Sequence, residues 1–131
     1  VEYIAPVTYQ IEKNFTDITK ISLRSAGEKL ILKIGGGLEK AVEIVCGAGE
    51  WEYNRFDHCP MSPTEFVGAL AIGIRADIMA AWGSDGDKLT VKLRFVSTPH
   101  EIILEFDRAA GKLTIMKSVD KGGNRLEFKL F

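Results

Sequence analysis

The strongest constraint on the fold is a series of short segments in which apolar and polar residues alternate. In residues 89–95, with the sequence LTVKLRF, every second residue is apolar. A period of two is typical of a β-strand with one buried and one solvated face. Comparable segments, bounded by clusters of Gly, Pro, Asn or Ser, recur along the chain. We predict strands at Tyr3–Ile11, Ile18–Arg24, Lys29–Ile34, Ala41–Cys46, Trp51–His58, Leu89–Phe95, Glu101–Phe106, Lys112–Lys117 and Arg125–Leu130. Four of the first five would form one antiparallel meander, and the fifth either continues a bent strand or is not a strand.

One segment between these strands carries the signals of a helix. Ser62 can cap its N-terminus, Pro63 suits the first helical position, and Glu65 can complete a capping box. From Pro63 to about Trp82, apolar residues recur every four positions, as on one face of a helix. Residues 83–87, with the sequence GSDGD, then favour a stop. The sequence therefore predicts one long helix over residues 63–82.

Length and cysteine content indicate a single domain that folds without disulfide bonds. A chain of 131 residues buries roughly two thirds of its unfolded surface on folding. Cys46 and Cys59 are the two cysteines, and they lack Cys-x-x-Cys spacing, so we predict reduced thiols. Uninterrupted apolar runs are too short for a membrane helix, which predicts no membrane partner.

Charge is unevenly distributed along a chain whose net charge is only −1. Residues 1–87 hold 8 Lys and Arg against 13 Asp and Glu, whereas residues 88–131 hold 9 against 5. A basic half allows a polyanion-binding face, while the near-neutral total argues against a strong nucleic-acid binder that acts alone. A partner subunit could supply the missing positive charge.

Strand alternation places many of the cations on one face of their strands. On this pattern alone, an ordinary solvated sheet face competes with a platform on which Lys and Arg neutralise phosphates. Trp51 and Tyr53 share a strand face with Arg55, so they are candidates for stacking on bases, although strand aromatics more often belong to a core. The predicted nucleic-acid-binding residues are Lys20, Arg24, Lys29, Lys33, Trp51, Tyr53, Arg55, Lys92, Arg94, Lys112, Arg125 and Lys129.

Motifs for catalysis, cofactors and metals are weak. Residues 47–49, with the sequence GAG, lack the third glycine of a dinucleotide fingerprint, and residues 35–40 lack Walker spacing. Neighbours in Asp57-His58-Cys59 point to opposite faces of a strand, so they cannot form a local triad. Cys46, His58, Cys59 and His100 lack the short paired spacing of a structural zinc site. We therefore predict no enzymatic activity, no cofactor and no metal.

The junction between the aromatic strand and the predicted helix resembles that of the Whirly family. The resemblance lies in three segments, Trp51-Glu52-Tyr53, Met61-Ser62-Pro63-Thr64-Glu65 and Val67-Gly68-Ala69-Leu70. The resemblance implies an α+β fold of two antiparallel four-stranded sheets with a helix after the first, in the order ββββ-α-ββββ, without the family's second helix. It divides the single domain 1–131 into a first sheet and helix at 1–83 and a second sheet at 88–131.

The resemblance also implies a function, namely binding of single-stranded nucleic acid by a tetramer. The lysine-rich segment of the plant DNA-binding members has no counterpart here, the nearest residues being Glu12–Thr16. The chain is more similar to the kinetoplastid mitochondrial guide-RNA-binding proteins of the same fold. That branch implies a mitochondrial RNA-annealing matchmaker in RNA editing, with guide RNA and a related subunit in a heterotetramer as partners. The alternatives are a plant-like single-stranded DNA-binding transcription factor and a structural oligomerisation module.

Overall fold

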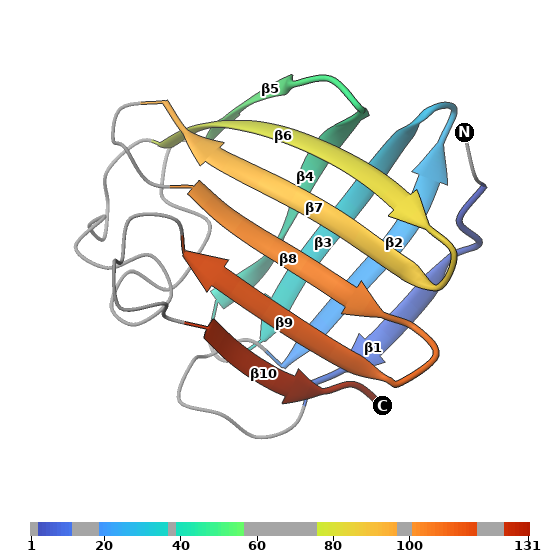
Figure 1. The fold of residues 1–131 in the computed structure, drawn as a ribbon. Helices are drawn as coiled ribbons and strands as arrows, with labels where there is room; N and C mark the ends of the chain where they lie inside the picture. Colours follow the sequence, from blue (N-terminus) through green and yellow to red (C-terminus); the bar gives the residue numbers. More distant parts are fainter. Residues whose placement is uncertain (1–2, 12–18, 37–38, 57–75, 97–100, 118–124) are drawn as a thin grey trace.

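In its described part the protein is built from β-strands alone (Figure 1). The computed structural model describes residues 3–11, 19–36, 39–56, 76–96, 101–117 and 125–131. Ten strands lie within these ranges. They are β1 Val7–Gln10, β2 Lys20–Ala26, β3 Lys29–Gly36, β4 Glu39–Ala48, β5 Glu52–Phe56, β6 Ala76–Asp85, β7 Lys88–Phe95, β8 Glu101–Asp107, β9 Lys112–Lys117 and β10 Arg125–Lys129.

The predicted helix is wrong over the part of it that the structure describes. Residues 76–82 belong to β6, and residues 63–75 lie outside the described residues. The error has a physical cause, because a spacing of four residues fits a strand face as well as a helix face. Ile78, Ala80 and Trp82 are buried, whereas Met79 and Ala81 between them are partly exposed, which is the alternation of a strand. The α+β fold with two separate four-stranded antiparallel sheets is therefore replaced by an all-β fold.

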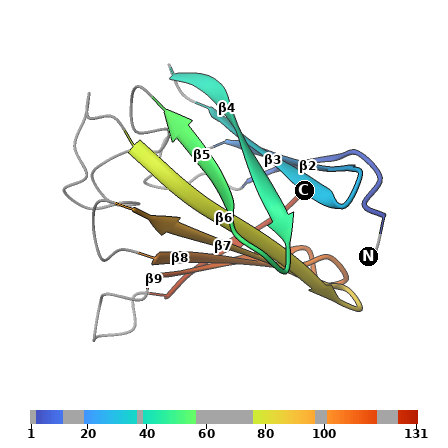
Figure 2. The same ribbon diagram turned by 90° about the horizontal axis from the view of Figure 1, so that it is seen from above.

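The strands form one mixed sheet that curls into a half-barrel. Its order is β1-β2-β3-β4-β6-β7-β8-β9-β10, with β5 pairing to β6 beside this path. The described strands pair antiparallel except for β4 with β6, where Gly47 faces Ala81 and Ala48 faces Trp82. The ends of the sheet meet, because Gln10 and Phe131 exchange backbone hydrogen bonds of 2.9 and 2.8 Å. Viewed from above, the layer β2–β4 and the layer β6–β9 converge where β4 ends (Figure 2).

Tight turns fix the register of the hairpins. Ala26 faces Lys29 and Asp85 faces Lys88, so each of these hairpins has a loop of only two residues. Gly27 and Gly86 open the loops with φ angles of 64°. Side chains rarely adopt this left-handed conformation, so glycine suits both positions. Residues 83–87 thus form the β6–β7 hairpin in place of the predicted helix end.

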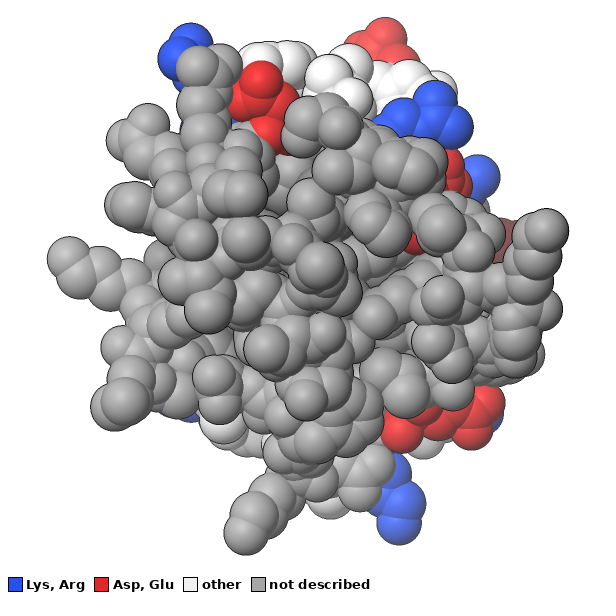
Figure 3. All heavy atoms as spheres, turned by 90° about the vertical axis from the view of Figure 1, so that its left-hand side faces the viewer, with Lys and Arg blue, Asp and Glu red and all other residues white. Residues whose placement is uncertain are grey.

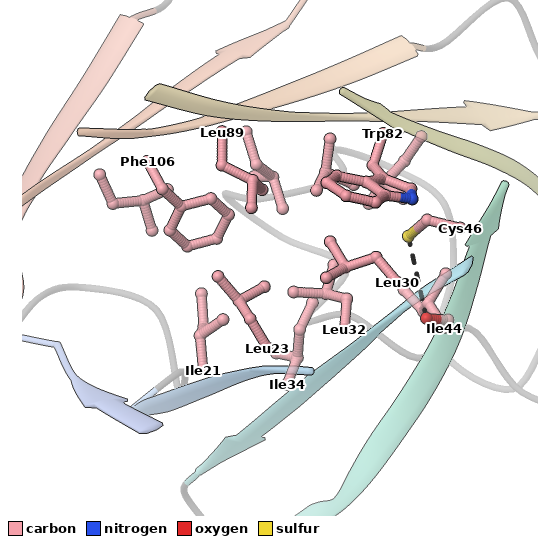
Figure 4. Close-up of a cluster of buried hydrophobic side chains, with 14 of the residues drawn as sticks. Ile21, Leu23, Leu30, Leu32, Ile34, Ile44, Cys46, Trp82, Leu89 and Phe106 are labelled. Carbon is pink, nitrogen blue, oxygen red and sulfur yellow. Dashed lines mark hydrogen bonds between the residues drawn. The ribbon is translucent and has the colours of Figure 1, made fainter. Parts of the chain in front are cut away.

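The core lies between the two layers of the curled sheet. Leu89, Phe106 and Trp82 face Leu23 and Leu30 across the interior (Figure 4). The indole Nε1 of Trp82 also donates a 3.1 Å hydrogen bond to the carbonyl oxygen of Glu28, in the β2–β3 turn. Trp82 therefore joins the layers both by packing and by a polar contact.

Candidate nucleic-acid interface

The predicted binding residues are divided between surfaces that face away from one another. Lys20, Arg24, Lys29 and Lys33 are exposed on β2 and β3. Lys92 and Arg94 are exposed on β7, in the layer on the other side of the core. Lys112, Arg125 and Lys129 belong to β9 and β10, and the side chain of Arg125 lies outside the described part. The curl of the sheet thus separates cations that alternation had placed on one side.

Carboxylates neutralise many of these cations. Arg24 pairs with Glu43 at 3.6 Å, Lys29 with Glu52 at 2.8 Å, and Lys112 with Glu127 at 3.2 Å. Figure 3 shows blue and red side chains beside each other at the rim of the described surface. A sheet face on which each cation lies next to an anion attracts a polyanion weakly. These ion pairs lower the positive potential around the three cations, as the 3.2 Å pair with Glu101 does around Arg94 on β7.

A different grouping appears on the outer face of β5, β6 and β7. Trp51 and Tyr53 are 40% and 51% exposed, although both are large aromatic residues. Tyr53 faces Met79 across the β5–β6 pair, and Met79 faces Arg94 across the β6–β7 pair. The guanidinium of Arg94 lies over the Trp51 ring, 5.3 Å from its centroid. We call Trp51, Tyr53, Arg55, Lys92 and Arg94 the aromatic–cation patch.

Buried Asn54 fixes the side from which β5 presents its aromatic residues. Its Oδ1 accepts a 2.9 Å hydrogen bond from the Val45 N–H, and its Nδ2 donates a 2.8 Å bond to the Val45 carbonyl. The side chain thereby pairs with β4 at the point where β4 and β5 diverge. Since neighbours in a strand point to opposite faces, a buried Asn54 turns Tyr53 and Arg55 outward.

Arg94 is oriented from two sides. Its NH2 atom lies 3.2 Å from Oε2 of Glu101 on β8, and its guanidinium covers the Trp51 ring. Cation–π contact and ion pairing together hold a long side chain that would otherwise sample many rotamers. Arg55 and Lys92 are exposed on the same face. The patch thus combines two aromatic rings with three cations.

An open cleft of about 650 Å³ adjoins the patch. Trp51 and Lys92 belong to the patch and also line the cleft, together with Ala81 and Gly83 of β6. Sequence reasoning missed these two small residues because it placed residue 81 on a helix and residue 83 in its stop. Their small side chains could have identified them, because Ala81 and Gly83 alternate along the strand with the buried Ala80 and Trp82.

Reactive cysteine chemistry is disfavoured at Cys46. The side chain is buried, and its Sγ donates a weak hydrogen bond of 3.8 Å to the Ile44 carbonyl (Figure 4). Burial raises the pKa of the Cys46 thiol to about 12 by desolvating the thiolate. The group is therefore a protonated thiol at neutral pH and a poor nucleophile.

Metal-ligating side chains do not cluster within the described ranges, where no group of three or more His, Cys, Asp or Glu could hold an ion. His58, Cys59 and His100 lie outside those ranges. The expected lack of enzymatic activity, cofactor and metal stays a prediction. The described residues also contain no helix that is long and apolar enough to cross a membrane.

Comparison of the chain with family models, curated proteins and solved structures finds no match. Support for a binding step therefore comes from the chain's own residues and their geometry.

Proposed function

We propose that this protein binds single-stranded nucleic acid, preferably RNA, through the aromatic–cation patch. The observation that carries the proposal is the exposure of Trp51 and Tyr53 on the same outer face as Arg94. Large aromatic residues are costly to leave in water, and at such a site they offer flat surfaces on which unpaired bases stack. Duplex bases are stacked on each other already, so this chemistry favours single strands.

Binding of a single strand requires neutralisation of its sugar–phosphate backbone as well as base stacking, and the cations of the patch supply this neutralisation. Arg55, Lys92 and Arg94 lie on neighbouring strands around the two rings. A strand that stacks its bases on the rings would carry its phosphates past these side chains. Glu101 neutralises part of the charge of Arg94, so we propose a binder of modest affinity that gains from a more basic partner subunit.

The biological setting is proposed from the sequence resemblance of residues 51–70 to the Whirly family, and from the lack of the plant members' lysine-rich segment, for which residues 12–16 are the nearest material. This choice of branch implies guide RNA as the ligand, mitochondrial RNA editing as the process, and a heterotetramer with a related subunit as the assembly. The patch geometry supports only the binding step of this proposal. A plant-like DNA-binding role predicts equal affinity for single-stranded DNA and RNA, which parallel titrations of both would reveal.

A second candidate is an oligomerisation module, favoured by the exposure of Val96 at 54% beside the patch strands. Aromatic, Arg and Met side chains are also enriched in protein interfaces. Under this candidate, reversing Lys92 and Arg94 to Glu dissociates the assembly, as light scattering would detect, and leaves RNA affinity unchanged.

Salt dependence of RNA binding tests the proposal. Fluorescence anisotropy of a labelled single-stranded RNA at several salt concentrations should give a log-affinity against log-salt slope of about −2, because each neutralised phosphate contributes about −0.7. Lys92→Gln should make the slope shallower by about 0.7. Lys20→Gln, which removes an exposed lysine on β2, should leave it unchanged. Absence of binding at low salt, or a flat plot, would contradict the proposal.

A further inference from the structure

The cleft beside the patch is lined by small residues and by an aromatic side chain. These are Ala81 and Gly83 of β6, and Trp51. Thr90, Lys88 and Glu105 line the cleft from β7 and β8. Its volume of about 650 Å³ falls in the range of small-ligand sites.

Gly83 lies within a strand, where glycine weakens the sheet. A Cβ added to it would meet no atom within 4 Å, and its φ lies outside the left-handed region. Neither packing nor backbone conformation therefore requires glycine. What the missing side chain provides is open space above β6, at the point where the cleft lies.

The charges of the cleft differ from those of the patch. Three carboxylates, those of Glu50, Asp85 and Glu105, line it together with Lys88 and Lys92. An excess of carboxylates repels phosphate and accepts hydrogen bonds from N–H groups. The Oε1 of Glu105 lies 3.8 Å from the Nζ of Lys88, beyond hydrogen-bond distance. The cleft therefore suits a base, while the cations of the patch, Arg55, Lys92 and Arg94, suit phosphates.

We infer that the cleft takes one guanine base of the bound strand, an inference that rests on the proposed function. Guanine is the standard base with two adjacent N–H donors, N1–H and the N2 amino group, on its Watson–Crick edge. A carboxylate accepts two parallel hydrogen bonds, so Glu105 matches this edge. The ring stacks on Trp51, and Lys92 meets the neighbouring phosphate at the boundary of cleft and patch.

Three short RNAs that differ at one base test this inference, namely UUUGUUU, UUUIUUU and UUUUUUU, where I is inosine. Inosine keeps N1–H and lacks the N2 amino group. The unaltered protein should bind the guanosine strand about ten-fold more tightly than the inosine strand, within the range of one bidentate pair. Gly83→Ile, which fills open space, and Glu105→Gln should each abolish this preference while keeping affinity for UUUUUUU.

The control is Glu127→Gln, since Glu127 also pairs with a lysine of a neighbouring strand but lies outside the cleft lining. It should keep the guanosine preference, and circular dichroism should show all three variants folded. Equal affinity of the unaltered protein for the guanosine and inosine strands, or a preference that survives Gly83→Ile, would overturn the inference. Failure to bind any of the three strands at low salt would instead overturn the proposed function.

Discussion

Trp82→Ala is expected to lower the free energy of unfolding by about 3–5 kcal/mol, the typical cost of removing a large core aromatic. The side chain is only 4% exposed and packs in the core between the layers. The substitution also leaves the Glu28 carbonyl without its 3.1 Å indole donor. Urea denaturation followed by circular dichroism would measure the change.

Trp82→Phe keeps a buried aromatic ring but loses the Nε1 donor and part of the ring volume. We expect a cost of about 1–3 kcal/mol, from the unpaired Glu28 carbonyl and the small cavity together. If Trp82→Ala costs no more than Trp82→Phe, then residue 82 does not lie in the core between the layers.

Trp51→Ala is expected to have the opposite profile, with a large effect on RNA affinity and a small effect on stability. Loss of one stacking surface costs about 1–3 kcal/mol of binding, or roughly 5- to 150-fold in affinity. Because the ring is 40% exposed, we expect a change in unfolding free energy within about 1 kcal/mol. Anisotropy titrations and urea denaturation of the same preparation would measure both quantities.

Two further variants act as controls for Trp51→Ala. Trp51→Phe keeps a stacking face and should retain most of the affinity. Tyr3→Ala removes an aromatic side chain that is 71% exposed outside the patch, and it should leave affinity unchanged. If the Trp51→Ala protein binds RNA as tightly as the unaltered protein, then Trp51 does not stack on the bound bases.

Much of the strand pattern could be predicted from local alternation. The predicted segments at 89–95, 101–106 and 112–117 coincide with β7, β8 and β9 to within one residue. Alternation also predicts which side of a strand a residue occupies, as for Tyr53 and Arg55. It failed at residues 76–82, because the every-fourth spacing that includes Ile78 and Trp82 satisfies both periods, and the choice depends on pairing with β5 and β7.

The site depended on long-range pairing that local patterns do not encode. Trp51 and Arg94 are 43 positions apart in the sequence, and they meet because β6 pairs with both β5 and β7. The curl of the sheet places Lys20 and Lys92 on opposite layers, and it brings Gln10 and Phe131 together at the two ends of the sheet. The sequence therefore identified candidate side chains, whereas the structure selects which of them act together.

Mapping of backbone amide chemical shifts during titration with a short single-stranded RNA tests the central claim most directly. We predict that the largest shifts fall on the outer face of β5, β6 and β7, at Trp51, Tyr53, Met79, Ala81 and Arg94. The exposed cations of β2 and β3, Lys20 and Lys33, should shift little and serve as internal controls. Shifts concentrated on β2 and β3, or no shifts at RNA concentrations that saturate the anisotropy signal, would contradict binding at the aromatic–cation patch.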